Sequence, residues 1–243
     1  MKVVADFHTH TVYSHGKGSI RDNVLAALKK GLKKIVIADH GPGHWLYGVK
    51  KKDLYEMRKE IDELKKQFKE IEILLGVEAN IISLDGDLDV DDEILSIIDI
   101  LLAGFHNGAF FKTAKDWQEL YFKNKLSKII PALKQSCRIT NTIAMVKAIK
   151  KNKIDIITHP GAKVDIDTKE VAKAAAEKGT LLEINSSHGF LNVDYVKVAM
   201  KENVKFVINS DAHTPYDVGN IDKGIDIAIK AGLPFDRIVN IEI

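Results

Sequence analysis

Short apolar runs alternate with longer amphipathic segments along the chain. The runs are rich in Ile, Leu and Val, as expected of strands that are buried on both faces. They cover residues 3–7, 35–39, 71–78, 97–105, 154–158, 180–185 and 205–209. The pattern therefore predicts seven buried strands.

The segments between these runs have the spacing of surface helices. The clearest one carries apolar residues three and four positions apart, which places them on one face of a helix. These residues are Leu54, Met57, Ile61, Leu64 and Phe68. Polar residues that favour helix N-termini predict further helix starts. They stand near Ser19, Asp91, Asp116, Thr140, Asp167, Asn192 and Asp217. The repeated order of strand, helix and strand predicts parallel strands joined by right-handed crossovers.

Length and composition fit one such α/β unit. A chain of 243 residues has the ordinary length of a single closed α/β barrel, so we expect one domain over residues 1–243. Apolar residues make up 45% of the chain, and 36 Lys and Arg balance 34 Asp and Glu. This composition argues against disorder and, weakly, against nonspecific DNA binding.

Membrane and export signals are not evident in the sequence. The longest apolar stretch, 94–105, is interrupted by Asp99 and is shorter than the roughly 20 residues that span a bilayer. The first residues lack the basic and apolar regions of a secretory signal. The single cysteine, Cys137, allows no internal disulfide, and we interpret it as a structural thiol between two helices. These features predict a cytoplasmic protein with no membrane segment.

Polar residues able to bind a metal or a substrate stand at or just after the ends of the apolar runs. They are His8, His10, Asp39, His40, Glu78, His106, His159, Asn185, Asp211 and His213. The carboxyl ends of parallel barrel strands meet on one face, so residues far apart in sequence should converge there. His8 and His10 should point to the same side of their strand, as should Asp211 and His213 if the last strand extends through them.

A shared metal explains this convergence better than separate structural roles. Burying many imidazoles without a common partner would leave donors and acceptors unsatisfied. Imidazoles with a minority of carboxylates suit zinc, or iron and manganese in a mixed set. So many ligands exceed the needs of one tetrahedral ion, which predicts roughly two or three ions with bridging groups.

The same residues lie in motifs that resemble the PHP (polymerase and histidinol phosphatase) family. The motifs are DFHTH at Asp6, HGKGS at His15, ADHGPG with Asp39, GVEAN with Glu78, GFH with His106, THPG with His159, LEINSS with Glu183 and SDAH with Asp211. Three of them, ADHGP, THPG and EINSS, are most similar to small stand-alone members of the YcdX type, a group assigned to the phosphatases. The similarity extends from the first strand to about Gly219.

The resemblance implies a distorted (β/α)7 TIM-like barrel, with parallel strands, outer helices and a trinuclear metal site. It assigns His8, His10, Glu78 and Asp211 to one ion. Glu78 would bridge to a second ion that His106 and His159 also bind. The third ion would be held by His15, His40 and His213. The implied cofactors are three divalent transition-metal ions; zinc is the expected one, with manganese or iron as alternatives.

Several further residues are expected near the site. Asp6 shares the face of the ligands and should orient one of them, whereas Asp39 should point away and pack or cap. Asn185 should reach the rim, and Lys163 is a candidate for substrate binding against the alternative of a solvated lysine. His44 and His188 are interpreted as loop or rim histidines on the solvated side, with His188 as a candidate acid or substrate contact.

The predicted reaction is hydrolysis of a phosphate ester. A cluster of cations favours an anionic substrate and lowers the pKa of a bound water, so a metal-bound hydroxide would attack phosphorus and no protein nucleophile is needed. We expect a small phosphorylated substrate. The alternatives are a nuclease or nucleotide phosphatase acting on nucleic-acid ends, a histidinol phosphatase, and a noncatalytic metal-binding scaffold. Nucleic acid is not the expected partner because no helix carries a basic stripe. Formation of a homo-oligomer stays open.

Overall fold

Seven parallel strands form a nearly closed barrel in the computed structural model, which describes residues 2–242. Their order in the sheet follows their order in the chain. They are β2 (Ala5–Thr9), β3 (Lys34–His40), β4 (Glu72–Asn80), β5 (Ile100–Gly104), β6 (Ile156–Ile157), β7 (Leu181–Asn185) and β8 (Phe206–Asn209). Each of the seven predicted strands overlaps one of these. The predicted (β/α)7 barrel is therefore confirmed.

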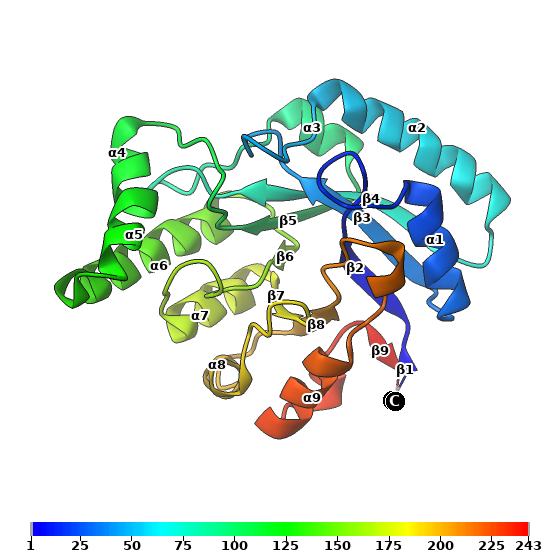
Figure 1. The fold of residues 1–243 in the computed structure, drawn as a ribbon. Coiled ribbons are helices and arrows are strands. Elements are labelled where there is room, and N and C mark those ends of the chain that lie inside the picture. The colour runs from blue at the N-terminus through cyan, green and yellow to red at the C-terminus, as the bar shows by residue number, and fades with distance from the viewer. Residues whose placement is uncertain (1, 243) are drawn as a thin grey trace.

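Helices surround the strands on the outside of the barrel (Figure 1). The α-helices are α1 (Ile20–Lys29), α2 (Lys51–Gln67), α3 (Asp92–Ile97), α4 (Ala114–Trp117), α5 (Lys123–Ser127), α6 (Lys134–Lys151), α7 (Thr168–Lys178), α8 (Val193–Ala199) and α9 (Asp222–Ala231). A π-helical turn, η1 (Gln118–Phe122), joins α4 to α5, and 3-10 turns are η2 (Pro131–Leu133), η3 (Pro215–Asp217) and η4 (Phe235–Arg237). Within residues 2–242, no helix combines the length and the apolar character that crossing a bilayer requires.

Most of the predicted helix starts coincide with observed N-caps. Ser19 accepts a hydrogen bond from the Asp22 amide in a capping box. The side chains of Asp91, Asp167 and Asn192 also accept hydrogen bonds from amides in the first turns of their helices. The expected starts near Thr140 and Asp217 are wrong. A 3-10 turn leads directly into α6, so this helix begins at Lys134 without a polar cap.

Cys137 consequently lies inside α6, where it is buried, and not between two helices. Asp217 ends the 3-10 turn η3, and α9 begins five residues later at Asp222. Local cap chemistry could not reveal either boundary, because no side chain caps α6 or α9; for α6 the preceding turn supplies the first hydrogen bond, from the Lys134 amide to the Pro131 carbonyl.

The two ends of the chain pair with each other in a small antiparallel sheet. It consists of β1 (Lys2–Val3) and β9 (Ile241–Glu242), with Lys2 opposite Glu242. The predicted first strand, 3–7, is thus divided: Val3 belongs to β1, and the barrel strand starts at Ala5.

The barrel closes next to the ends of β2 and β8. Thr9 forms a parallel bridge with Ala212, and the His10 amide donates to the Ala212 carbonyl at 2.8 Å. At the opposite end, the Asn240 side chain donates to the carbonyls of Ala5 at 2.8 Å and Ile208 at 2.6 Å. The first and last barrel strands are therefore joined across the seam, which brings the segments after β2 and β8 together.

Apolar side chains fill the barrel below these strand ends. Val36, Ala38, Leu102, Ile156 and Val207 form one fully buried cluster. On β3, the side chains of Val36 and Ala38 alternate with Ile35 and Ile37, which pack against the outer helices. The polar residues at the strand ends thus lie directly above an apolar layer inside the barrel.

Candidate metal centre

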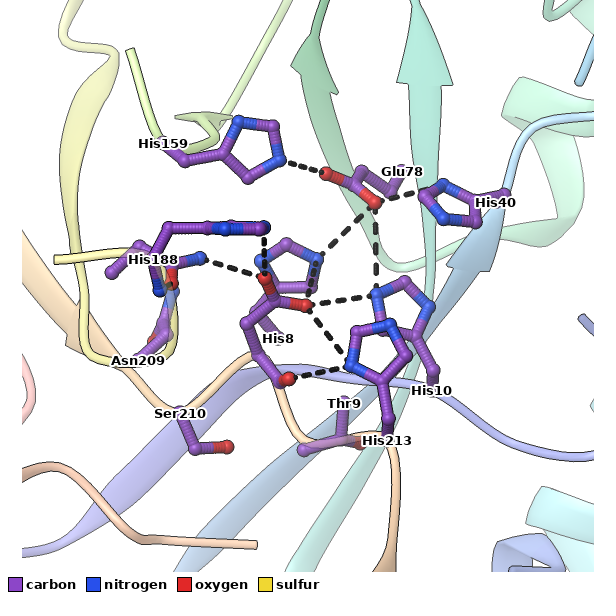
Figure 2. A network of polar contacts seen from close by, with 12 residues as sticks. His8, Thr9, His10, His40, Glu78, His159, His188, Asn209, Ser210 and His213 are labelled. Carbon is purple, nitrogen blue, oxygen red and sulfur yellow. Dashed lines mark hydrogen bonds and ion pairs between the residues drawn. The ribbon is translucent and has the colours of Figure 1, made fainter. Parts of the chain in front are cut away.

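Glu78, on β4, lies at the centre of a group of histidines and is 1% exposed (Figure 2). Its Oε1 lies 3.0 Å from His106 Nε2 and 3.1 Å from His159 Nε2. Its Oε2 lies 2.9 Å from His40 Nδ1 and 3.3 Å from His8 Nε2. The two carboxylate oxygens therefore face two different sets of imidazoles.

Asp211 is the second carboxylate of the cluster. Its Oδ1 lies 3.2 Å from His10 Nε2 and 3.6 Å from His8 Nε2. Its Oδ2 accepts a hydrogen bond from Asn185 at 3.0 Å and lies 3.4 Å from His188 Nε2. Figure 2 shows His8, His10 and His188 converging on the same place as Glu78.

His15 and His213 stand side by side at one edge of the cluster. Their ring centroids are 4.1 Å apart, and the ring of His15 lies 4.9 Å from that of His40. Eight of the nine predicted ligands line one cavity of about 230 Å³. The ninth, His8, is fully buried and lies behind this lining. Tyr47 stacks on His15 with the ring centroids 4.4 Å apart and closes part of the wall.

Within residues 2–242, four sets of three side chains bring ligand atoms within 4.8 Å of one another, close enough to share an ion. The sets are His8, His10 and Asp211; His40, Glu78 and His106; His10, His15 and His40; and His159, His188 and Asp211. The first set agrees with the predicted first ion. The last set includes His188, which was expected only as an acid or a substrate contact.

Unpaired buried nitrogens fit metal binding. Among the described residues, His8 Nε2, His10 Nδ1, His15 Nδ1 and His40 Nδ1 make no hydrogen bond of acceptable geometry, although His40 Nδ1 and His8 Nε2 lie close to Glu78 Oε2. Leaving buried polar atoms unpaired is costly unless another partner takes the place of a hydrogen bond. The donor set of imidazoles and two carboxylates suits a divalent transition metal.

Glu183, which was not predicted as a site residue, lies behind the cluster. Its Oε1 is 2.8 Å from His8 Nδ1 and accepts from Asn209 at 2.9 Å, and its Oε2 accepts from the His159 amide at 2.7 Å. A carboxylate on the rear nitrogen of a metal-binding histidine fixes the orientation of the ring. Glu183 and Asn185 are two residues apart on β7, and this spacing was the sequence signal that they share the interior face.

A second buried chain of hydrogen bonds supports His106. Its Nδ1 lies 2.8 Å from Asn80 Oδ1, and the Asn80 amide group in turn donates to Asp89 Oδ2 at 2.5 Å. Asp89 also accepts from the backbone amides of Asn80 at 2.7 Å and Gly43 at 2.8 Å. Neither Asn80 nor Asp89 was predicted as a site residue, although Asn80 follows Glu78 at the strand spacing of two.

Asp6 and Asp39 hold the backbone around the ligands. Asp6 accepts hydrogen bonds from the amides of Gly219 at 2.8 Å, Ser210 at 3.2 Å and His8 at 3.4 Å, so it positions main chain and does not touch an imidazole. Asp39 accepts from the Thr11 amide at 2.8 Å and from its hydroxyl at 2.5 Å. These bonds fix the loop that leads to His15.

His44 corrects the expectation of a solvated loop histidine. Only 9% of the residue is exposed, and its ring stacks on His40 with the centroids 5.0 Å apart. The Tyr47 amide donates to His44 Nδ1 at 3.1 Å, and burial lowers the pKa of His44 to about 4. His188 does lie at the rim, 3.2 Å from Lys163 Nζ, and both residues line the cavity.

Two of the predicted ligands have strained backbones. His159 has φ 28° and Asp211 has φ 55°, and among residues 2–242 these are the non-glycine residues with positive φ. Such conformations persist only where the surroundings hold them, and they cluster at functional sites. The condition that the last strand extends through Asp211 and His213 is not met, because β8 ends at Asn209.

Burial and charge set the protonation of the cluster. Burial disfavours the charged forms of Glu78 and Asp211, but the surrounding histidines hold the pKa of each carboxyl well below its ordinary value. Burial also lowers the pKa of His8, yet the charges of Glu78, Glu183 and Asp211 outweigh it and raise the pKa well above its ordinary value. Burial lowers the pKa of His15 to about 3, with His213 and His40 adding to the effect. The carboxylates are thus ionised and His15 is neutral at pH 7, as metal ligands must be, whereas His8 has to release its proton before it can bind an ion.

Comparisons with known proteins identify the family of this chain and agree with the barrel fold. The family model of the PHP domain matches residues 6–187. A protein named a probable phosphatase from Thermoanaerobacter sp. (strain X514) is 32% identical over 262 residues, covering 100% of this chain and 92% of that protein. A probable phosphatase from Shewanella sp. (strain MR-4) is 34% identical over 255 residues, covering 99% of this chain and 88% of that protein.

A solved structure shares the fold at low identity. The histidinol phosphate phosphatase from Lactococcus lactis, complexed with zinc, L-histidinol and phosphate, has a TM-score of 0.65 and 17% identity, covering 96% of this chain and 95% of that chain. The barrel and its cluster of imidazoles and carboxylates define a parallel α/β barrel with a candidate metal site at the ends of its strands. The chain belongs to the PHP domain family, and the predictions of this family and of an enzyme of the phosphatase class are confirmed.

Proposed function

We propose that this protein is a metal-dependent phosphoesterase that hydrolyses a small phosphorylated substrate at a trinuclear centre, with residues 1–243 acting as one metallohydrolase domain. The observation that supports the proposal most strongly is that the two carboxylate oxygens of Glu78 face two different sets of histidines. A carboxylate whose two oxygens face separate imidazole groups has the arrangement of a ligand that bridges two ions.

The proposed ligand sets are those that the family motifs imply, and the neighbours in the cluster match them in part, because His40 also lies beside Glu78 and His106. His8, His10, Glu78 and Asp211 would hold one ion, and the free Nε2 of His8 is directed toward both carboxylates. Glu78, His106 and His159 would hold the second ion. The third would be held by His15, His40 and His213; the ring of His15 lies next to each of the other two. Zinc is the proposed ion, with manganese or iron as alternatives. Bound divalent ions would supply positive charge for the phosphoryl oxygens and lower the pKa of a water.

The residues at the rim contribute to substrate binding. Lys163 places a cation at the mouth of the cavity, 3.2 Å from His188 Nε2. Burial, with the charges of His159 and Lys163, lowers the pKa of His188 to about 4, so this ring is neutral at pH 7. Of the two roles considered for His188, contact with the substrate therefore fits better than proton donation.

The test is hydrolysis of a generic aryl phosphate by protein loaded with zinc or manganese, by protein treated with a chelator, and by His159→Ala. We expect the rate to fall by at least about 100-fold in the last two, because the centre loses its ions or a ligand. Full activity without metal, or in His159→Ala, would rule out the mechanism. Tight metal binding with no hydrolysis of any phosphate ester would favour the noncatalytic scaffold.

The substrate class needs a wider screen. Phosphorylated metabolites, L-histidinol phosphate and short oligonucleotides should be assayed with protein of known metal content. Preferred hydrolysis of a small monoester supports the proposal, whereas preferred release from oligonucleotide ends would reassign the protein to the nucleic-acid processing alternative.

A further inference from the structure

Four lysines lead away from the metal cavity along one side of its mouth. Lys163 lines the cavity over the metal centre and also two neighbouring hollows. Lys125 and Lys128 line the first hollow, next to His106. Lys128 and Lys134 line the second, which has a volume of about 440 Å³. We call this path, defined by Lys125, Lys128, Lys134 and Lys163, the lysine groove.

The charges of the lysine groove are not neutralised by the protein. Among the described residues, none of its four lysines has a carboxylate oxygen within the 4.0 Å of an ion pair, although Asp165 lines the second hollow. Lysines close by in sequence behave differently. Lys123 pairs with Glu119 at 2.6 Å, and Lys112 pairs with Asp87 at 2.9 Å. The groove therefore keeps an excess of positive charge that is available to a ligand.

Neighbouring side chains give the groove a defined shape. Lys125 lies over the ring of Tyr121, with Nζ 5.2 Å from the centroid. Asn124 lines both hollows, and it is fixed by reciprocal hydrogen bonds with the buried Asn141 at 2.9 and 2.8 Å. The floor of the groove is thus formed by side chains with defined partners.

We propose that the lysine groove binds a second phosphate group, carried by the leaving group of the substrate. This inference rests on the proposed function, because it assumes that a first phosphate occupies the metal centre. Lys163 borders both places, so a molecule anchored at the centre can continue past it toward Lys128 and Lys134. Small bisphosphorylated esters and oligonucleotides with phosphodiester groups share this chemistry.

The first test measures binding, which does not depend on catalysis. Calorimetry on the metal-loaded protein compares α,ω-alkanediphosphonates of several chain lengths with the matching alkylphosphonates, none of which can be hydrolysed. We expect at least one diphosphonate to bind about tenfold more tightly than its monophosphonate, as charge-assisted contacts to two lysines would provide. The double variant Lys128→Ala/Lys134→Ala should lose most of this preference and keep its affinity for the monophosphonate.

The matched control is Lys197→Ala, which removes an exposed lysine on α8 that does not line the groove. Its diphosphonate preference should equal that of the unchanged protein. Equal binding of mono- and diphosphonates, or the same loss in the control as in the double variant, would overturn the proposal.

Hydrolysis separates the two proposals. If the groove is an accessory site, kcat/KM for phenyl phosphate should be the same in the double variant. Hydrolysis of phenyl phosphate together with no diphosphonate preference would reject the groove alone. A retained preference with no hydrolysis of any ester would reject the proposed function alone. A 5′-phosphorylated trinucleotide, measured in parallel, identifies the source: if Lys128→Ala/Lys134→Ala weakens binding of the trinucleotide more than binding of the diphosphonates, the second anion is assigned to a phosphodiester.

Discussion

The Nδ1 atom of His8 lies 2.8 Å from Glu183 Oε1, and both side chains are fully buried. This contact turns the other ring nitrogen, Nε2, toward Glu78 and Asp211. A glutamate on β7 thereby sets the orientation of a histidine on β2, across the seam of the barrel.

Glu183→Gln should weaken metal binding without unfolding the protein. The amide keeps the size of the side chain but removes the charge that holds the rear of the His8 ring, and such changes lower metal affinity by about 10–100-fold. Competition with a chromogenic chelator measures the affinity, and circular dichroism checks the fold. Glu170→Gln, at an exposed position of α7, is the control. Unchanged affinity in Glu183→Gln would contradict the role assigned to Glu183.

Asp89→Asn should destabilise the protein. The partly buried carboxylate accepts hydrogen bonds from the Gly43 amide and from the backbone and side-chain amides of Asn80. An asparagine amide in its place would point an N–H group at one of these N–H groups, so one hydrogen bond would be lost. We expect a loss of about 1–3 kcal/mol in the free energy of unfolding, measured with urea. Asp92→Asn, at an exposed site in α3, should change it little. A loss no larger than that of the control would show that the chain from Asp89 to His106 is unimportant for stability.

Removal of metal should lower the melting temperature. A ligand that binds only the folded state stabilises it, by about 4 kcal/mol at a thousand times its dissociation constant. Thermal unfolding with added zinc and with a chelator measures the shift. His159→Ala should show a smaller shift, because it lacks one ligand. Identical melting in zinc and in chelator would argue against a metal centre in the folded protein.

Asp87 should make stability depend on pH. Hydrogen bonds from Lys151, Lys112 and Ser83 hold the pKa of Asp87 well below its ordinary value. A carboxyl whose pKa is lower in the folded state stabilises the fold above its unfolded pKa of about 3.9, and this contribution is lost as the pH falls toward the folded pKa.

Asp87→Asn should therefore cost about 1 kcal/mol at pH 7, with the difference shrinking below about pH 4. Denaturant unfolding of both proteins at several pH values measures it. Asp85→Asn, which removes a carboxylate 79% exposed, should have a smaller effect. A cost for Asp87→Asn that stays constant from pH 7 down to pH 3 would contradict the assignment.

Gly86→Ala should destabilise the turn that packs against α6. Gly86 has φ 76°, and a Cβ there would lie 2.3 Å from the Ala148 amide nitrogen. Gly179, with φ 72°, has no atom within 4 Å of such a Cβ among the described residues. Both substitutions carry the same backbone strain, so Gly86→Ala should cost about 1–3 kcal/mol more than Gly179→Ala in urea unfolding. Equal costs would show that the turn relaxes away from α6.

The sequence by itself determined the strands and the place where the candidate ligands meet. Buried parallel strands read as continuous apolar runs, and their carboxyl ends must converge, so His8, Glu78, His159 and Asp211 could be brought together without coordinates. The family motifs then supplied the proposed grouping of the ligands.

Only the tertiary structure decided which side chains hold the ligands in place. Glu183 reaches His8 from 175 residues away, and Asp89 reaches His106 through Asn80. The burial of His44 and the pairing of β1 with β9 were likewise hidden. The periodicity of a sequence indicates which face of a strand or helix a residue occupies. A hydrogen bond between distant segments depends on the distance between them in the closed barrel. No local sequence pattern contains that distance.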